Sequence, residues 1–320
     1  MNVRARSKPP HIGRRAVITG AAALSAGVAA CDGAPPLNIA LHPWPGYEFM
    51  RLASRSNLVD APVKIVDTTT VQQSLEMIMN GSVDGAGLTL DQVLGLRRSG
   101  QDIAVALVFD VSAGADALLA VPEIYSLGAL RGKWIGVERS TLGEIMLAKV
   151  LESAGLDRSG IEVAYIDDDH VAAWDRGGLD AIITYDPARS QLRSRGLRQI
   201  FDSRRLPRLI FDVLGVRRSS ANRKATALRK LNAAHFALLD EWKRSPVDLA
   251  YRLATMLSSS PEEVIDSYAG LDLPDAVYNR RYLTPPALEM TAAAQEVAAI
   301  LAFPVPANDI FVAEFLPGAR

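Results

Sequence analysis

Short apolar runs alternate with amphipathic helical patterns from Leu37 to about Arg217. The run LNIALH (37–42) precedes the helical pattern YEFMRLASRSN (47–57), and the next apolar run, PVKIVD (62–67), precedes another helical pattern. Alternation of strands and helices is typical of a mainly parallel sheet with helices on both faces. Beyond Arg217 only helical patterns remain. The sequence therefore predicts an α/β fold with a helical C-terminal part.

A short internal repeat predicts two lobes of similar construction. The segments GSVDGAGLT (81–89) and GGLDAIITY (177–185) share a glycine, an apolar residue before an aspartate, and a strand that ends at a helix start. Thr89 begins a capping box, and Asp186 precedes a proline at the expected first helical position. We expect the two segments to occupy equivalent places in two α/β lobes.

Two extended apolar segments are candidates for the strands that join these lobes. ADALLAV (115–121) and RLIFDVLGVRR (208–218) stand at the two ends of the middle region. If the chain crosses at both, the middle region is a lobe inserted into the other, and the two connectors form a hinge. The expected division is an export signal with a lipobox at 1–31, lobe 1 at 37–117 and 213–320, and lobe 2 at 118–212.

The first 31 residues have the layout of an export signal. Five basic residues and no acidic one come before a weakly apolar stretch from Ala16 to Ala30. Val28, Ala29 and Ala30 lead into Cys31, the only cysteine of the chain. This resembles a lipobox, in which the cysteine is lipidated and becomes the mature N-terminus; a buried free thiol is the alternative. We expect a protein anchored by a lipid at the periplasmic side of the cell membrane.

The export route and the remaining charge follow from the same segment. The pair Arg14-Arg15 resembles a twin-arginine signal, and an ordinary basic n-region is the alternative. Removal of the signal takes five of the 35 basic residues and none of the 36 acidic ones, which leaves 30 against 36 and a formal net charge of −6. Nucleic acid is not an expected partner, because it requires a concentrated basic face. The stretch from Ala16 to Ala30 is shorter than the ~20 apolar residues that a spanning helix needs, and no other segment of the sequence is long and apolar enough.

Residues directly after the predicted strands are the candidates for ligand binding, because ligands of open α/β sheets bind beyond the carboxyl ends of the strands. Trp44 stands between two prolines in such a loop, which favours a ring that stacks on a ligand, although it could only cap the first helix. Thr89 and Ser140 are expected to cap helices whose N–H groups can also face a ligand. The predicted ligand-binding residues are Trp44, Tyr47, Thr89, Asp110, Ser112, Asp116, Ser140, Thr141, Tyr185, Asp186 and Asp212.

The loop DVSAGAD (110–116) lies between two apolar runs. Gly114 permits a tight turn, and the small side chains leave room for a ligand. Buried carboxylates are costly unless polar groups partner them. We expect Asp110 and Asp116 at the floor of a cleft beside the hinge, with bracing of the turn by backbone N–H bonds as the alternative.

Six blocks of the sequence resemble, in order, those of a known family. The blocks are HPWPGYE (42–48), GLTLDQVL (87–94), DVSAGADAL (110–118), LRGKWIGVERSTLGE (130–144), DAIITYDPA (180–188) and IFDVLGVRR (210–218). This similarity extends from Leu37 to about Arg218, and the chain is similar to periplasmic substrate-binding lipoproteins of the nitrate/sulfonate/taurine (NMT1/THI5-like) ABC importer family. The resemblance implies a type II periplasmic binding protein fold, with a cleft between two lobes joined by two crossing strands. It also implies capture of a small molecule and its delivery to an ABC permease and ATPase.

Catalysis is not expected. Outside the signal the histidines are His42, His170 and His235, and none belongs to a recognisable catalytic motif. The run DDDH (167–170) lacks a matching ligand cluster and indicates a solvated helix start, so neither a metal nor a cofactor is predicted. A pyrimidine-synthesis enzyme of the same fold would be expected to carry a cysteine-rich iron-binding motif. The sequence has only Cys31, so this class of enzyme is not favoured. A lipoprotein that senses a ligand and acts on a membrane signalling partner stays open as an alternative. In either role we expect a monomer.

The charges of the strand-end loops favour a cationic ligand. Arg139 is the only basic side chain among these loops. Several carboxylates facing a partly dehydrated cleft would repel an anion and favour an ammonium, an amidine or a protonated heterocycle. We therefore expect a cationic or zwitterionic nitrogen-containing ligand, with a nitrate or sulfonate as the alternative. The acidic residues are Glu48, Asp110, Asp116, Asp186 and Asp212, of which Asp186 can instead cap a helix and Asp212 can fix the hinge strand.

Overall fold

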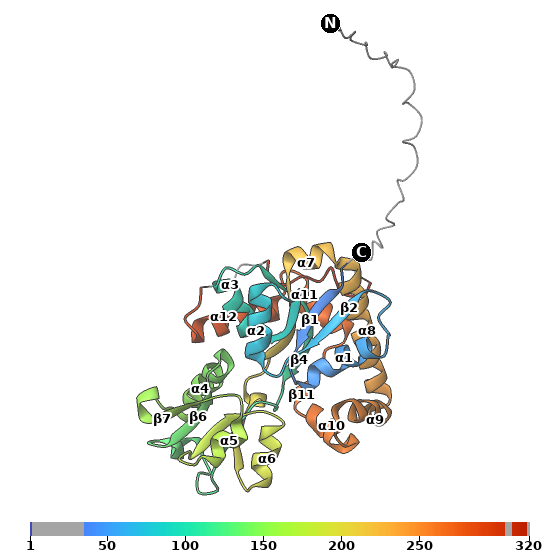
Figure 1. The fold of residues 1–320 in the computed structure, drawn as a ribbon. Coiled ribbons are helices and arrows are strands. Elements are labelled where there is room, and N and C mark those ends of the chain that lie inside the picture. Colours follow the sequence, from blue (N-terminus) through green and yellow to red (C-terminus); the bar gives the residue numbers. More distant parts are fainter. Residues whose placement is uncertain (2–34, 305–308, 319–320) are drawn as a thin grey trace. The chain divides into compact units, whose positions relative to one another are not determined.

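The strands of the computed structural model form two sheets, and the helices pack around them (Figure 1). The structure describes residue 1, residues 35–304 and residues 309–318, so the predicted signal and Cys31 lie outside the described residues. Pro35–Arg320 forms one unit, and both sheets belong to it. No helix in the described ranges is both long and apolar enough to span a membrane.

The first sheet has six strands in the order β11-β4-β10-β3-β1-β2. Three of them, β2, β1 and β3, run parallel, and β10 runs antiparallel between β3 and β4. The second sheet has five strands in the order β7-β6-β8-β5-β9. The strands are β1 (Leu37–Leu41), β2 (Val63–Asp67), β3 (Gly85–Thr89), β4 (Ile103–Ser112), β5 (Ala117–Ala120), β6 (Trp134–Glu138), β7 (Glu162–Ile166), β8 (Ala181–Thr184), β9 (Arg198–Asp202), β10 (Phe211–Arg217) and β11 (Leu271–Asp272).

The two sheets share one topology. In the second sheet β7, β6 and β8 run parallel, and β5 lies antiparallel between β8 and β9, as β10 lies between β3 and β4. The two repeat segments form β3 and β8, which hold the same place in their sheets. Asp212 of β10 faces Thr89 on one side and Asp110 on the other, and Ala117 of β5 likewise faces Thr184 and Asp202.

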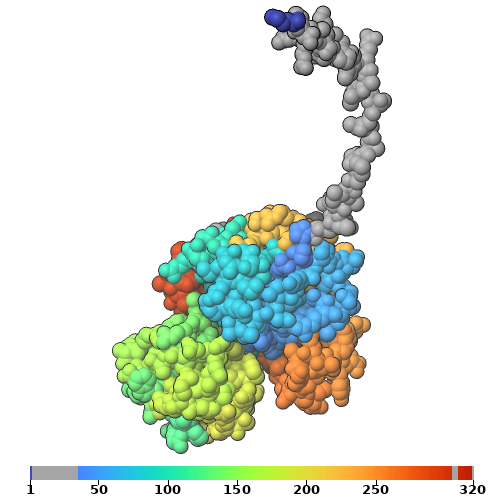
Figure 2. All heavy atoms as spheres, viewed as in Figure 1, coloured from blue at the N-terminus to red at the C-terminus, as the bar shows by residue number. Residues whose placement is uncertain are grey.

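The helices of the α/β part begin and end where the sequence signals predict. The helical pattern that follows PVKIVD forms α2, which starts after Thr70, whose side chain accepts the N–H of Gln73, and ends at Gly81 with φ of +81°. The helices are α1 (Glu48–Arg55), α2 (Val71–Asn80), α3 (Leu90–Arg98), α4 (Thr141–Ala154), α5 (His170–Asp175), α6 (Ala188–Ser194), α7 (Arg218–Arg223), α8 (Ala225–Arg244), α9 (Pro246–Leu257), α10 (Pro261–Tyr268), α11 (Ala276–Leu283) and α12 (Leu288–Ile300), with a 3-10 turn, η1, at Pro45–Tyr47. Helices α7 to α12 form the predicted helical C-terminal part, and their orange residues lie against the blue residues of the first sheet in Figure 2.

The chain passes between the sheets through two connections, residues 113–116 and 203–210. The hydroxyls of Ser112 and Ser203 lie 2.7 Å apart, and Ser203 Oγ also accepts the N–H of Gly114 at 2.7 Å. The N–H of Ser203 donates to the carbonyl of Asp116 at 2.9 Å. The two connections are thus held side by side. Sheet membership changes at these connections, and the lobe boundaries predicted from the sequence stay a prediction.

The free edge of β4 is covered by side chains and by the C-terminal segment. Beyond the short β11, the backbone N–H of Val108 donates to Asn279 Oδ1 at 2.7 Å, and Asn279 Nδ2 donates to the carbonyl of Val108 at 2.9 Å. Asn232 Nδ2 donates to the carbonyl of Ala106 at 3.2 Å, and Val105 pairs with residues 310–312. A buried strand edge needs such partners for its N–H and carbonyl groups.

We predict that Asn279→Ala lowers the free energy of unfolding by about 2–3 kcal/mol, because both backbone groups of Val108 lose their partner in a buried place. Urea denaturation followed by circular dichroism measures the change. Asn222→Ala, at an exposed position of α7, is the matched control and should leave the midpoint within error. Equal midpoints for the two variants would contradict the role assigned to Asn279.

Candidate functional site

A cavity of about 180 Å³ lies where the carboxyl ends of strands from both sheets meet. Residues after β1, β2 and β3 line it from one side, and residues after β6, β7 and β8 line it from the other. This is the place that the strand-end rule predicts for a ligand. The lining residues are His42, Pro43, Trp44, Thr69, Thr70, Val71, Thr89, Gln92, Asp116, Glu138, Ser140, Leu142, Asp168, Tyr185, Asp186, Pro187 and Asp212.

The loop after β1 lies directly over two aspartates. Trp44 Nε1 donates to Asp110 Oδ2 at 3.0 Å, and the hydroxyl of Tyr47 donates to Asp212 Oδ1 at 3.0 Å. A Cβ atom at Gly46 would lie only 1.8 Å from Asp110 Oδ2, so this approach requires a glycine. Trp44 lines the cavity, whereas Tyr47 is fully buried beneath it.

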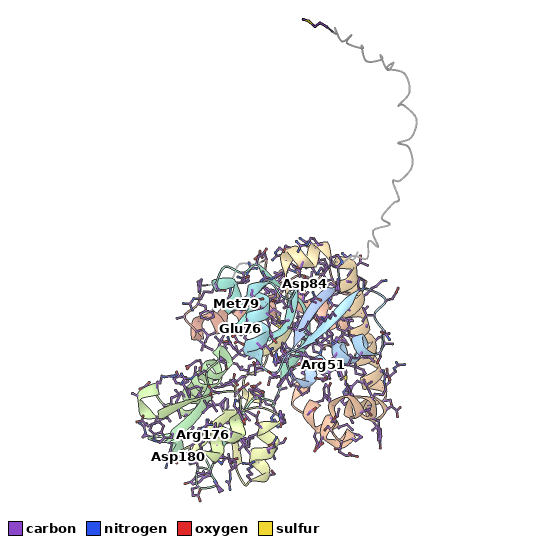
Figure 3. All side chains as sticks on the ribbon, viewed as in Figure 1. Arg51, Glu76, Met79, Asp84, Arg176 and Asp180 are labelled. Carbon is purple, nitrogen blue, oxygen red and sulfur yellow. The ribbon has the colours of Figure 1, made fainter. Side chains whose placement is uncertain are left out.

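Arg51 of α1 anchors the start of this loop (Figure 3). Its Nη2 donates to the carbonyls of Leu41 and His42 at 3.0 and 3.3 Å, while the guanidinium pairs with Glu48 and, at 2.8 Å, with Asp67. Arg51 is buried, so these contacts hold the backbone at the end of β1 in a fixed position. The sequence did not single out Arg51, because it lies within a helix and not after a strand.

Asp110 and Asp212 form a buried pair of carboxyl groups. They face each other on the adjacent antiparallel strands β4 and β10. Burial raises the pKa of Asp110 to about 7, although the bond from Trp44 opposes the shift. Burial and the neighbouring charge of Asp110 raise the pKa of Asp212 well above its usual range. Asp212 lines the cavity, whereas Asp110 does not.

Asp116 is a third buried carboxyl group, and it has a free oxygen. Its Oδ2 has no hydrogen-bond partner within the described part of the chain. Burial raises the pKa of Asp116 to about 6, against the opposing effects of a hydrogen bond from Ser112 and the charge of Arg189. A buried, unpartnered oxygen that lines a cavity is suited to accept a hydrogen bond from a ligand.

The second lobe contributes a hydrogen-bonded network at Glu138. The hydroxyl of Tyr185 donates to Glu138 Oε2 at 2.8 Å, and His170 Nε2 lies 3.0 Å from the same oxygen. Burial opposes ionisation of Glu138, but these bonds outweigh it and hold the pKa below its usual range. The rings of Tyr185 and Trp44 meet edge to face at 6.1 Å, so each lobe contributes one aromatic side chain to the cavity.

Arg189 lies near the cavity but does not line it, and its positive charge is neutralised by Asp186. Its guanidinium pairs with Asp186 and donates to the carbonyl of Gly114, and it therefore ties α6 to the connection between the sheets. Asp186 Oδ1 also accepts the N–H of Ser190 at 3.1 Å. Helix α6 begins at Ala188, one residue after the proline at which the sequence predicted it.

The lining of the cavity is acidic. Burial and the charge of Arg51 lower the pKa of His42 to about 4, so this imidazole is neutral at physiological pH. None of the described residues that line the cavity is a lysine or an arginine. Five of them carry a carboxyl group: Asp116, Glu138, Asp168, Asp186 and Asp212.

The structure brings most of the predicted residues to the cavity and places four elsewhere. Tyr47 and Asp110 lie beneath the lining, and Ser112 bonds Ser203 between the two connections. Thr141 of α4 donates to Asp91 of α3, a contact between the lobes. Those at the cavity are Trp44, Thr89, Asp116, Ser140, Tyr185, Asp186 and Asp212, and their binding roles stay predictions.

The interpretation of residues 167–170 as a solvated helix start was wrong for His170. This side chain is buried, with Nδ1 3.0 Å from Thr184 Oγ1 and Nε2 close to Glu138. Asp169 does cap the helix, by accepting the N–H of Ala172 at 2.9 Å. Glu138 itself could have been found, because it directly follows the apolar run KWIGV (133–137).

The model of one protein family, described as NMT1/THI5-like, matches residues 59–234, more than half of the 320 residues. The chain belongs to the NMT1/THI5-like family. The matched segment contains the cavity residues from Thr69 to Asp212 and most of both sheets. No curated protein matches the sequence.

Solved structures share the fold of this family member. The ligand-binding component of an ABC-type import system from Staphylococcus aureus, with zinc bound, is 13% identical, with a TM-score of 0.71 over 89% of this chain and 99% of that one. The alkanesulfonate-binding protein SsuA from Xanthomonas axonopodis, bound to MOPS, is 20% identical, with a TM-score of 0.65 over 88% and 99%. The desulfurization enzyme DSZB is 16% identical, with a TM-score of 0.63 over 87% and 97%. The predicted two-lobed periplasmic binding protein fold is confirmed.

We predict that the free energy of unfolding falls as the pH rises above about 4, by about 1.4 kcal/mol per pH unit for each proton that the folded chain retains and the unfolded chain has lost. In the folded chain the pKa of Asp212 is raised, whereas in the unfolded chain an aspartate titrates near 3.9. The stabilisation from the bound proton is therefore complete below about pH 4 and is lost as the pH rises through the folded pKa. Thermal unfolding should show a fall in Tm of roughly 2–4 °C per pH unit.

Two variants test the assignment of this slope. Asp212→Asn cannot ionise at this position and should flatten the decline. Asp202→Asn is the matched control, because its carboxyl group occupies the equivalent place to Asp110 in the second sheet and its pKa, lowered to about 2 by Arg204, keeps it ionised throughout. A decline that persists in Asp212→Asn would assign the slope to other groups.

Proposed function

We propose that the protein is an extracytoplasmic solute-binding lipoprotein that captures a small nitrogen-containing cation or zwitterion in this cavity and delivers it to an ABC permease. The acidic lining carries the proposal. Of the five lining carboxyl groups only Asp186 is paired with an arginine, and none of the described lining residues is a lysine or an arginine, so the partly dehydrated site favours a positive charge. The rings of Trp44 and Tyr185 provide faces and edges for a planar or cationic group.

The family supports the transport role, and the cavity argues for a different ligand charge. Fold relatives include a ligand-binding component of an importer and an alkanesulfonate-binding protein. A sulfonate in this cavity would meet Asp116, Asp212 and Glu138 without a lining guanidinium or ammonium group from the described residues. We therefore infer that the ligand of this protein differs in charge from that of the alkanesulfonate-binding relative.

The size of the cavity limits the ligand. Its volume of about 180 Å³ is close to that of an engineered cavity of ~150 Å³ that holds benzene. A ligand of roughly ten or fewer non-hydrogen atoms therefore fits the cavity. Such a molecule could contact both lobes at once, so its binding would favour the closed arrangement.

Binding without catalysis is the simplest use of these side chains. Ser140 Oγ accepts the N–H of Gly143 at 3.0 Å and caps α4, while the ring of His170 is held between Glu138 and Thr184. One fold relative is named as an enzyme, so a test for turnover accompanies the binding assays. A sensor that presents its closed form to a membrane signalling protein remains the second candidate, and genes for a permease and an ATPase beside this one would favour import.

We predict that amines bind and the matching sulfonates do not. Calorimetric titration of benzylamine against phenylmethanesulfonate, and of ethylamine against ethanesulfonate, should show affinities at least tenfold higher for the amines, because a charge-assisted bond contributes about 1.5–3 kcal/mol. Asp116→Asn should weaken amine binding by roughly 10- to 100-fold.

Asp157→Asn is the control for this titration. It removes one carboxylate at an exposed position and should leave the affinity unchanged. Tight binding of a sulfonate that is unchanged or improved by Asp116→Asn would contradict the proposed ligand class and favour an oxyanion.

We predict that Cys31 is the mature, lipid-modified N-terminus. Mass spectrometry of the protein extracted from membranes should give a chain that begins at Cys31 and carries lipid mass. Cys31→Ser should appear in the soluble periplasmic fraction or keep its signal. A mature chain that starts at another residue and lacks a lipid would contradict the anchoring.

A further inference from the structure

Two carboxyl groups face each other at the floor of the cavity. Asp212 of β10 lies opposite Asp110 of β4, where the two strands are hydrogen-bonded neighbours. Asp110 is fully buried and Asp212 is 4% exposed. Each receives one hydrogen bond from an aromatic side chain, from Trp44 Nε1 to Asp110 and from the Tyr47 hydroxyl to Asp212. Neither donor carries a positive charge.

The second carboxyl oxygen of Asp110, Oδ1, is buried and has no hydrogen-bond partner among the described residues. The neighbouring carboxyl group of Asp212 can donate a hydrogen bond to the Asp110 carboxyl group when it is protonated. No lysine or arginine of the described chain is paired with either residue. Two adjacent carboxylates in a buried place cannot both remain ionised without a compensating cation.

The other groups around the pair increase this demand for positive charge. The negative charge of Asp116, on the connection between the sheets, raises the pKa of both Asp110 and Asp212. The charge of Asp272 of β11 also raises the pKa of Asp110. The charge of Asp91 of α3 raises the pKa values of Tyr47 and Asp116. From the second lobe the charge of Glu138 raises the pKa of Asp116. Arg189, which lowers the pKa of Asp116, is the one cation among these neighbouring groups. Because Arg189 is already paired with Asp186, a proton or a ligand must supply the missing charge.

We propose that the empty site holds one proton between Asp110 and Asp212, and that the cationic group of the ligand displaces this proton. The proposal rests on the proposed function. The proton leaves the Asp212 carboxyl group through the cavity to water, and the positive charge of the ligand takes its place. No other bond changes, and the net charge of the site is the same before and after capture.

The geometry assigns different roles to the two carboxyl groups. Asp212 lines the cavity and can contact a ligand, whereas the η1 turn at Gly46 covers Asp110. Asp110 therefore acts as a positioning residue through its shared proton and its bond with Trp44. The unpartnered Asp116 Oδ2 provides a second acceptor for the same cation. A neutral isostere could not replace the displaced proton, so the exchange selects for ligand charge.

Exchange makes capture dependent on pH. If one proton is released for each ligand bound, the affinity for an amine rises about tenfold per pH unit as long as the pair remains protonated in the empty protein. The same linkage implies that acidification favours release. A site with both carboxylates already ionised would show an affinity independent of pH over this range.

The shared proton can be measured without a ligand. In the lipid-free mature protein with carbon-13 at the aspartate carboxyl groups, one proton of the pair should remain bound at pH 7, and its loss should be observed only at higher pH. Asp202 provides an ionised reference in the same spectrum. In Asp212→Asn the Asp110 signal should move toward that of an ionised carboxylate. Two ionised carboxyl groups in the wild-type protein at pH 7 would overturn the proposal and leave the proposed function intact.

The displacement is measured by calorimetry with the amine that binds most tightly among ethylamine and benzylamine. Titrations in phosphate and Tris buffers at the same pH should give binding enthalpies that differ because each buffer takes up the released proton with its own ionisation enthalpy. The size of this difference should correspond to one proton per bound ligand, and Asp212→Asn should abolish it. Asp157→Asn should retain it. An amine that binds without releasing a proton would overturn the exchange alone, whereas the absence of amine binding would contradict the proposed function and with it the exchange.

Discussion

The insertion of β10 between β3 and β4 is the constraint on which the site depends. This strand returns from the second sheet and runs antiparallel to both neighbours, so it joins the two lobes and completes the first sheet. Its register sets Asp212 between Thr89 and Asp110. A shift by one residue would turn Asp212 to the other face of the sheet and replace it with an apolar side chain. The joint between the lobes and the charge of the cavity therefore come from one strand.

The α/β fold could be predicted because its signals are local. Strand–helix alternation, the caps at Thr89 and Ser140, and the repeat that forms β3 and β8 all depend on residues close together in the sequence. Trp44, Asp116 and Asp186 were predicted for a similar reason, since the strand-end rule selects the edge of the sheet at which ligands bind. Asp212 was predicted from its place on the second crossing segment. The roles of these residues in binding remain predictions.

Contacts between distant segments could not be predicted in this way. Arg189 reaches Gly114 from within a helix, 75 positions away, and Asn279 pairs with Val108 across 171 positions. Neither residue belongs to a local motif. Ser112 was assigned to a loop after β4, but the strand continues through it and its hydroxyl bonds the opposite connection. A single sequence therefore indicates where a strand begins more clearly than where it ends and which distant residue its last side chain contacts.

The close approach of Gly46 to Asp110 links two parts of the sequence that are 64 positions apart. Any side chain at 46 would have to displace the carboxyl group of Asp110, and with it the partner of Trp44. Substitution at one position therefore changes which residues are tolerated at the other, so the two should vary together during evolution. A tryptophan two residues before a glycine, combined with an aspartate at this distance, is a pattern by which relatives with the same cavity floor can be recognised.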